Sequence, residues 1–138
     1  MAKKKIKIIR TINTGIFDAL ILLSVNFNYD ELTKKIGKEW TEPIANDKEL
    51  INSGSWLALS RIMEETKTGK KFHYFYIIIP EMFDFSDKHM VSLAHEVLHI
   101  CQFFMKDILD MEREYECVAY THTHIMKQCL KELREAYK

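Results

Sequence analysis

The sequence predicts an α+β fold in which a small mixed sheet of about three to four strands packs on two helices. Two observations support this prediction. The first half of the 138-residue chain consists of short apolar segments between polar turns, and the second half carries apolar residues at helical spacing. A chain of this length has room for one hydrophobic core, so we expect a single domain over residues 1–138, which includes a basic N-terminal segment at residues 1–10.

Three segments have the composition of β-strands, which favour β-branched and aromatic side chains. They are Ile16–Val25, Ser55–Met63 and Phe72–Ile79, and the last (F-H-Y-F-Y-I-I-I) carries the strongest signal. The charged segment 64–71 contains a glycine, so a hairpin is the economical connection between the last two strands. Pro80 ends the third strand, because proline cannot donate to a sheet ladder.

A short helix and a loop are expected between the first two strands. Asn28 or Asp30 can cap a helix over Glu31–Lys38, since both residue types accept hydrogen bonds from the first turn. Residues 41–54 are rich in Pro, Asn, Asp, Ser and Gly. This composition predicts mostly loop, with space for one helical turn.

Two long helices are expected in the second half of the chain. Ser86 or Asp84 is a suitable cap for a helix that runs to about Lys106 and has a broad apolar face. Residues 107–110 include two aspartates that favour a turn. A second helix is predicted from Met111 to the end of the chain.

The overall composition excludes several classes of protein. Twenty basic and twenty acidic residues cancel, so we expect neither a nucleic acid nor a membrane as partner. The three cysteines are odd in number and far apart, which fits a reducing compartment rather than a disulfide framework. Neither a signal-peptide pattern nor an apolar run of about 18 residues is present, so we expect a cytoplasmic protein.

The strongest functional signal is the motif His95-Glu96-Val97-Leu98-His99 in the first of the two long helices. Positions i and i+4 lie on one helix face, so His95 and His99 can offer two imidazole nitrogens to one zinc ion. Glu96 adjoins the first ligand and can act as a general base toward a water molecule on the metal. The motif therefore predicts one Zn²⁺ ion as cofactor.

A catalytic zinc ion needs a third protein ligand and one open coordination position. The segment E-R-E-Y-E-C-V-A-Y supplies three candidates, Glu112, Glu114 and Glu116. Glu116 is preferred because the small Ala119 that follows permits close approach of two helices. Glu112 lies one turn away on the same face and remains the chief alternative, whereas Glu114 points elsewhere.

The other histidines and the sulfur-containing residues are expected to be structural. His122 and His124 could supply a ligand in place of Glu116, yet all four remaining histidines are expected to be hydrogen-bonded structural residues. The methionines and cysteines near the motif are expected to fill the core rather than to bind metal.

The segment S-L-A-H-E-V-L-H (Ser92–His99), followed by E-C-V-A-Y (Glu116–Tyr120), resembles the small single-domain gluzincin-type zinc metallopeptidases. It also resembles compact H-E-x-x-H proteins encoded by bacteriophages and prophages. The likeness covers roughly Gly54–Met126 and is specific at the motif itself. Gln102 and Met105 stand where the longer metzincin motif needs glycine and histidine, so the metzincin form is excluded.

This resemblance implies a zincin-like fold with His95, His99 and Glu116 as zinc ligands and Glu96 as the base. It also implies that an edge strand before the motif helix pairs with the substrate backbone, which makes Ser55–Ile62 the candidate substrate-binding edge. The substrate-binding residues expected on that edge are Ser55, Trp56, Leu57 and Ala58.

Tyr120 is a candidate donor to an oxyanion or to a ligand, although a core position is the common role of such a tyrosine.

The predicted function is a zinc-dependent metallopeptidase-like hydrolase with a peptide or protein substrate. The alternatives are a non-catalytic zincin-fold binding protein of a phage or mobile element, and an H-E-x-x-H hydrolase that acts on other substrates. The small size allows a homo-oligomer or a partner protein that completes the binding groove.

Overall fold

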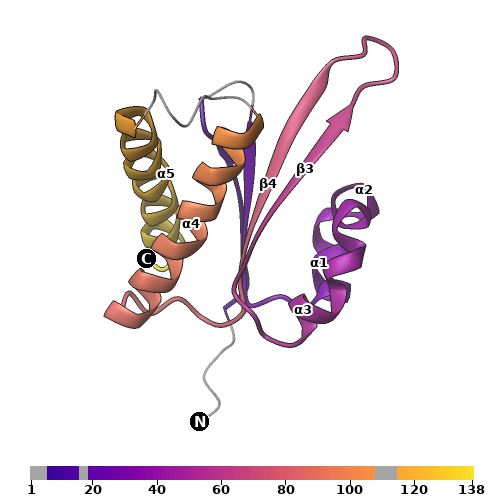
Figure 1. Cartoon of the computed structure of the whole chain (residues 1–138). Coiled ribbons are helices and arrows are strands. Elements are labelled where there is room, and N and C mark those ends of the chain that lie inside the picture. The colour runs from indigo at the N-terminus through magenta and orange to yellow at the C-terminus, as the bar shows by residue number, and fades with distance from the viewer. Residues whose placement is uncertain (1–5, 16–18, 108–114) are drawn as a thin grey trace.

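The computed structural model describes residues 6–15, 19–107 and 115–138, apart from the side chains of residues 105, 107 and 115–117. In these residues, four strands form one mixed sheet in the order β1–β2–β4–β3 (Figure 1). The strands are β1 (Ile8–Asn13), β2 (Leu20–Val25), β3 (Leu57–Glu64) and β4 (Lys71–Ile79). The central pair, β2 and β4, is parallel, and the two outer pairings are antiparallel.

Helices cover both faces of the sheet (Figure 1). The long helices α4 (Asp87–Asp107) and α5 (Tyr115–Ala136) lie side by side on one face. The short elements of the other face are α1 (Tyr29–Ile36), α2 (Lys38–Thr41), the 3₁₀-helix η1 (Glu42–Asp47) and α3 (Lys48–Asn52). The predicted α+β class with a small mixed sheet is therefore confirmed.

The central strands are buried on both faces because their apolar side chains alternate between two layers. Ile77 of β4 points into the layer with α4 and α5, and the adjacent Tyr76 and Ile78 point into the layer with α1–α3. This double burial explains why β2 and β4 read as continuous apolar runs in the sequence.

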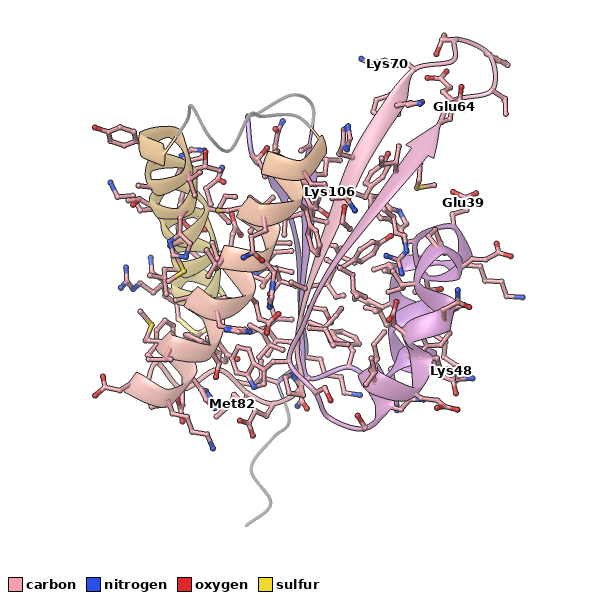
Figure 2. The ribbon with its side chains drawn as sticks, viewed as in Figure 1. Glu39, Lys48, Glu64, Lys70, Met82 and Lys106 are labelled. Atoms are coloured by element: carbon pink, nitrogen blue, oxygen red, sulfur yellow. The ribbon has the colours of Figure 1, made fainter. Side chains whose placement is uncertain are left out.

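The strand predictions are confirmed with shifted ends. The segment predicted at Ile16–Val25 contains β2 from Leu20 onward, and residues 16–18 lie outside the described part of the chain. The hairpin between β3 and β4 has the predicted connection, with Glu64 paired to Lys71. Figure 2 shows Glu64 and Lys70 near the end of this hairpin, which projects beyond the helices.

The sequence does not predict strand β1, because it indicates only a basic N-terminal segment at residues 1–10. Ile8 and Ile12 are each 4% exposed and join the core under α5, while Arg10 between them is solvent-exposed. The intervening charged and polar residues hid the strand, because an edge strand with one buried face needs few apolar positions.

The prediction of mostly loop for residues 41–54 is wrong. Most of this segment is helical, as α2, η1 and α3 follow one another with little loop between them. Ile44 and Ile51 are 0% and 3% exposed, and their burial against the sheet stabilises short helices that have weak intrinsic propensity. The preceding helix, α1, is confirmed: Asn28 caps it, and Glu31 completes a capping box.

In the described part of the chain, none of the helices combines the length and the apolar character needed to cross a membrane. The predicted turn at residues 107–110 and the helix start at residues 111–114 fall in or next to the segment that the structure does not describe.

Candidate metal centre

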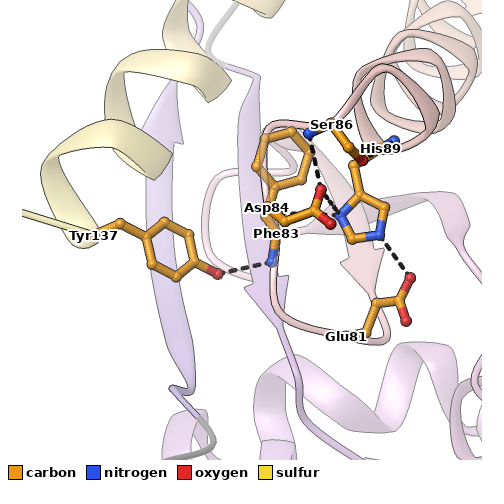
Figure 3. A network of polar contacts seen from close by, with 6 residues as sticks. All are labelled: Glu81, Phe83, Asp84, Ser86, His89 and Tyr137. Atoms are coloured by element: carbon orange, nitrogen blue, oxygen red, sulfur yellow. Dashed lines mark hydrogen bonds and ion pairs between the residues drawn. The ribbon is translucent and has the colours of Figure 1, made fainter. Parts of the chain in front are cut away.

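Helix α4 carries the H-E-x-x-H motif, and a compact network of side chains determines where it begins (Figure 3). Both predicted caps take part. The Ser86 hydroxyl accepts a hydrogen bond from the His89 backbone N–H at 3.2 Å. Two residues before Ser86, the Asp84 carboxylate accepts one from the Ser86 N–H at 2.8 Å. Two successive caps therefore satisfy donors at the helix start.

The imidazole of His89 joins this start to the loop after β4. His89 is only 6% exposed. Its Nδ1 atom accepts a hydrogen bond from the Asp84 backbone N–H at 3.1 Å, and its Nε2 atom lies 2.7 Å from Glu81 Oε1. Nδ1 also lies 2.9 Å from Asp84 Oδ1, so each ring nitrogen of His89 lies within hydrogen-bond distance of a carboxylate oxygen. The ring also packs on Trp56, with centroids 5.5 Å apart. We call Glu81, Asp84, Ser86 and His89 the α4 clasp.

The two motif histidines contact each other on successive turns of α4. The Nε2 atoms of His95 and His99 lie 3.0 Å apart, and the two rings are nearly perpendicular at 87°. His95 is exposed and His99 is partly exposed, so the contact faces solvent. The Nδ1 atom of His99 also lies 3.0 Å from Oε1 of Gln102.

This spacing suits a shared metal ion. Two nitrogen ligands about 2.1 Å from a tetrahedral zinc ion are separated by about 3.4 Å. The observed 3.0 Å between the Nε2 atoms of His95 and His99 is close to that value. That both imidazoles bind one zinc ion stays a prediction.

Glu96 lies on the inner side of the histidine pair. Glu96 follows His95 by one residue, so its side chain leaves the helix about 100° away from that of His95. The side chain is only 6% exposed. Burial raises the pKa of the Glu96 carboxyl above its ordinary value of 4.5, and the neighbouring His95 and His99 act in the opposite direction.

The stripe of α4 that carries Glu96 faces the β3–β4 hairpin. His89 and Phe103, seven residues before and after Glu96, share its stripe. The ring of His89 contacts Trp56 just before β3, and that of Phe103 stacks on Phe75 of β4 at 6.3 Å. Glu96 therefore lies on the side of α4 that faces the hairpin, between these two contacts.

Of the four predicted substrate-binding residues, two lie just before the edge strand β3 and two begin it, and β3 pairs with β4 alone in the described sheet. Trp56 and Ala58 pack into the layer of α4 and α5, and Leu57 packs into the opposite layer. Ser55 lies before the strand, with its hydroxyl oxygen 3.1 Å from that of Ser53. The strand thus turns alternate side chains toward the motif helix.

The side chain of the preferred third ligand, Glu116, lies outside the described residues, as do Glu112 and Glu114 entirely. The backbone of Glu116 belongs to α5, which runs antiparallel to α4 (Figure 1). His122 Nε2 of α5 lies 3.1 Å from the Ala94 carbonyl oxygen. Glu116 precedes His122 by six residues, and Ile100 follows Ala94 by six, which is about 9 Å along each helix. Because the helices are antiparallel, the Glu116 backbone lies level with Ile100, the residue after His99.

Tyr120 lies on α5 and is 72% exposed. It therefore lies away from the buried seam of the helix, and its predicted role as a hydrogen-bond donor stays a prediction.

Among the described side chains, no group of three or more His, Cys, Asp or Glu residues is arranged to hold a metal ion. The described part of the site thus consists of the two histidines, Glu96 and Gln102.

The remaining histidines mostly have the structural roles expected of them. His122 and His124 bond to the backbone carbonyls of Ala94 and Thr14, and His89 belongs to the α4 clasp. For His73, by contrast, the buried Nδ1 atom has no hydrogen-bond partner among the described residues. Sequence reasoning missed the contact of His99 with Gln102, although the i, i+3 spacing was a usable signal.

Comparison of the chain with known proteins gives no match to a family model, to a curated protein or to a solved structure.

Proposed function

We propose that the chain is a zinc-dependent hydrolase that cleaves peptide bonds, with His95 and His99 as two of the metal ligands. The observation that supports this most directly is the 3.0 Å separation of the two Nε2 atoms on the solvent side of α4. A zinc ion, when bound, acts as a Lewis acid that lowers the pKa of water and polarises a carbonyl group.

Glu96 is the proposed general base. Glu96 follows the first motif histidine directly, and its raised pKa lies in the direction that favours proton transfer near neutral pH. Burial keeps the carboxylate from being fully hydrated, so it accepts a proton more readily than a solvated glutamate does.

The substrate backbone is proposed to bind along β3. The outer edge of this strand has no partner strand in the described sheet, so its N–H and C=O groups can extend the sheet by one strand. Because the stripe of α4 with Glu96 faces the same hairpin, a bound peptide would run past the base. Glu116 is the proposed third ligand, and Tyr120 is the proposed hydrogen-bond donor.

Metal binding is tested first, without reference to activity. The metal-free protein is titrated with Zn²⁺ by calorimetry, and the metal content is measured by mass spectrometry under native conditions. We expect one ion per chain for the wild-type protein, and loss of at least about 100-fold in affinity for His95→Ala and His99→Ala. His124→Ala is the matched control, because His124 bonds to Thr14 rather than to the pair. Absence of stoichiometric zinc in the wild type overturns the proposal.

Catalysis is tested with Glu96→Gln on a peptide library whose cleavage is read by mass spectrometry. We expect turnover to fall by about 100-fold or more while zinc remains bound, since a general base contributes on that order. Glu135→Gln, an exposed glutamate on α5, is the matched control. A zinc-loaded wild-type protein that cleaves no peptide in the library would instead indicate a non-catalytic binding protein.

A further inference from the structure

The amide of Gln102 lies against the outer side of the motif histidines. Gln102 follows His99 by three residues on α4, so the two side chains share a helix face. Its Oε1 atom is 3.0 Å from Nδ1 of His99, while Nε2 of the same ring is 3.0 Å from His95. Both nitrogens of His99 are thus engaged, one by Gln102 and the other by the neighbouring imidazole.

These two contacts determine where the ring protons lie. An amide oxygen only accepts hydrogen bonds, so the proton of neutral His99 lies on Nδ1, where it can be donated to Gln102. Nε2 of His99 is then unprotonated and accepts a hydrogen bond from the Nε2–H of His95. His99 therefore presents an unprotonated nitrogen on the side where the two rings meet.

We propose that Gln102 is a positioning residue that keeps His99 in its Nδ1–H tautomer and orients the ring so that Nε2 is available to a divalent cation. Hydrogen bonds to the far nitrogen of a histidine ligand determine its tautomer and its orientation, and their loss commonly weakens metal binding. The effect on metal affinity rests on the proposed zinc site, whereas the tautomer can be observed without metal.

His95 and His99 differ in how readily they can bind a cation. His95 must release its Nε2 proton, or move it to Nδ1, before it can bind a cation, and His99 needs no such change.

Gln102 is exposed, so replacing it removes no core packing. A change in His99 after substitution of Gln102 can therefore be attributed to the lost amide contact.

The first test is the tautomer of His99 in the metal-free protein. Long-range ¹H–¹⁵N correlation spectra are recorded at about pH 8, above the ordinary histidine pKa of about 6.5. His99→Gln identifies the signals. We expect a protonated Nδ1 and a free Nε2 in the wild type, and a mixture of tautomers in Gln102→Leu. An Nε2–H tautomer in the wild type, or an unchanged spectrum in Gln102→Leu, overturns the proposal.

The second test is zinc affinity measured by competition with a chromogenic chelator. Gln102→Leu should bind zinc about 10- to 100-fold more weakly than the wild type, in the range usual for groups that support a ligand. Gln102→Glu should restore the affinity, because a carboxylate oxygen also accepts from Nδ1–H. Gln128→Leu is the matched control, since that amide bonds to Asn13 on β1 and lies away from the motif.

The two proposals fail in different ways. If the wild type binds no zinc, the proposed function and the metal-positioning role of Gln102 are both wrong, whatever the tautomer of His99. If the wild type binds zinc and Gln102→Leu binds it equally well, the zinc site stands and the inference on Gln102 is overturned.

Discussion

The imidazole of His122 on α5 bonds to the backbone of α4, with Nε2 3.1 Å from the carbonyl oxygen of Ala94. This contact joins residues 28 positions apart, and it sets the register of the antiparallel helix pair. A carbonyl in the middle of a helix already accepts an intrahelical bond, so His122 uses its second lone pair. The start of α5 is thereby held level with the residues that directly follow His99.

The register leads to a prediction about the third ligand. Glu116→Gln should lower zinc affinity by about 100-fold, or about 2.7 kcal/mol, because a carboxylate is replaced by a neutral amide. Glu112→Gln changes the same charge four residues earlier in the sequence and should leave the affinity within about twofold. Calorimetric titration of both variants checks this prediction, and a large loss confined to Glu112→Gln would assign the ligand to that residue instead.

The α4 clasp should contribute to stability. His89→Ala leaves the Asp84 N–H without its acceptor and removes the ring packed on Trp56, so we expect a loss of about 2 kcal/mol in the free energy of unfolding. Urea denaturation followed by circular dichroism measures the change. Lys88→Ala, on the exposed neighbouring residue, should shift the midpoint little. An equal loss in both variants would argue against the clasp.

Asp84 should make stability depend on pH in the acid range. The pKa of its carboxyl is lowered from the ordinary 3.8, chiefly by hydrogen bonds from the Ser86 hydroxyl and backbone N–H and to a smaller degree by His89. The folded protein favours the ionised form, so the stabilisation is present above about pH 4 and is lost as the pH falls through the folded-state value.

The variant Asp84→Asn cannot ionise and tests that dependence. We expect the wild type to be more stable than this variant at about pH 6, and the difference to shrink steadily below about pH 4. Urea midpoints measured across this range check the prediction. A difference that grows on acidification would show that the carboxylate is destabilising in the folded protein.

The buried thiols should be unreactive in the folded protein. Burial raises the pKa of Cys101 to about 11 and, together with the Glu132 charge, that of Cys129 to about 12. At about pH 8 only about one thiol in a thousand or fewer is then ionised, and the thiolate is the reactive form. Alkylation by iodoacetamide at these two positions, mapped by mass spectrometry, should be at least about 100-fold slower in native protein than in urea. Comparable rates would mean that these thiols are accessible.

Sequence pattern alone was sufficient for the elements whose signal is local. The apolar run of β4, the Asn28 cap of α1, the Ser86 cap of α4 and the i, i+4 spacing of His95 and His99 are each determined by neighbours in the chain. Their physics is that of hydrogen bonds and helix periodicity over a few residues. The α+β class followed from the same local patterns.

Tertiary packing decided what those patterns left open. Residues 42–52 are helical because Ile44 and Ile51 are buried against the sheet, and β1 is a strand because it completes the sheet beside β2. The orientation of Glu96 toward the β3–β4 hairpin depends on how α4 packs, through contacts between residues far apart in the chain. Burial and register are properties of the whole fold, so no local sequence window contains them.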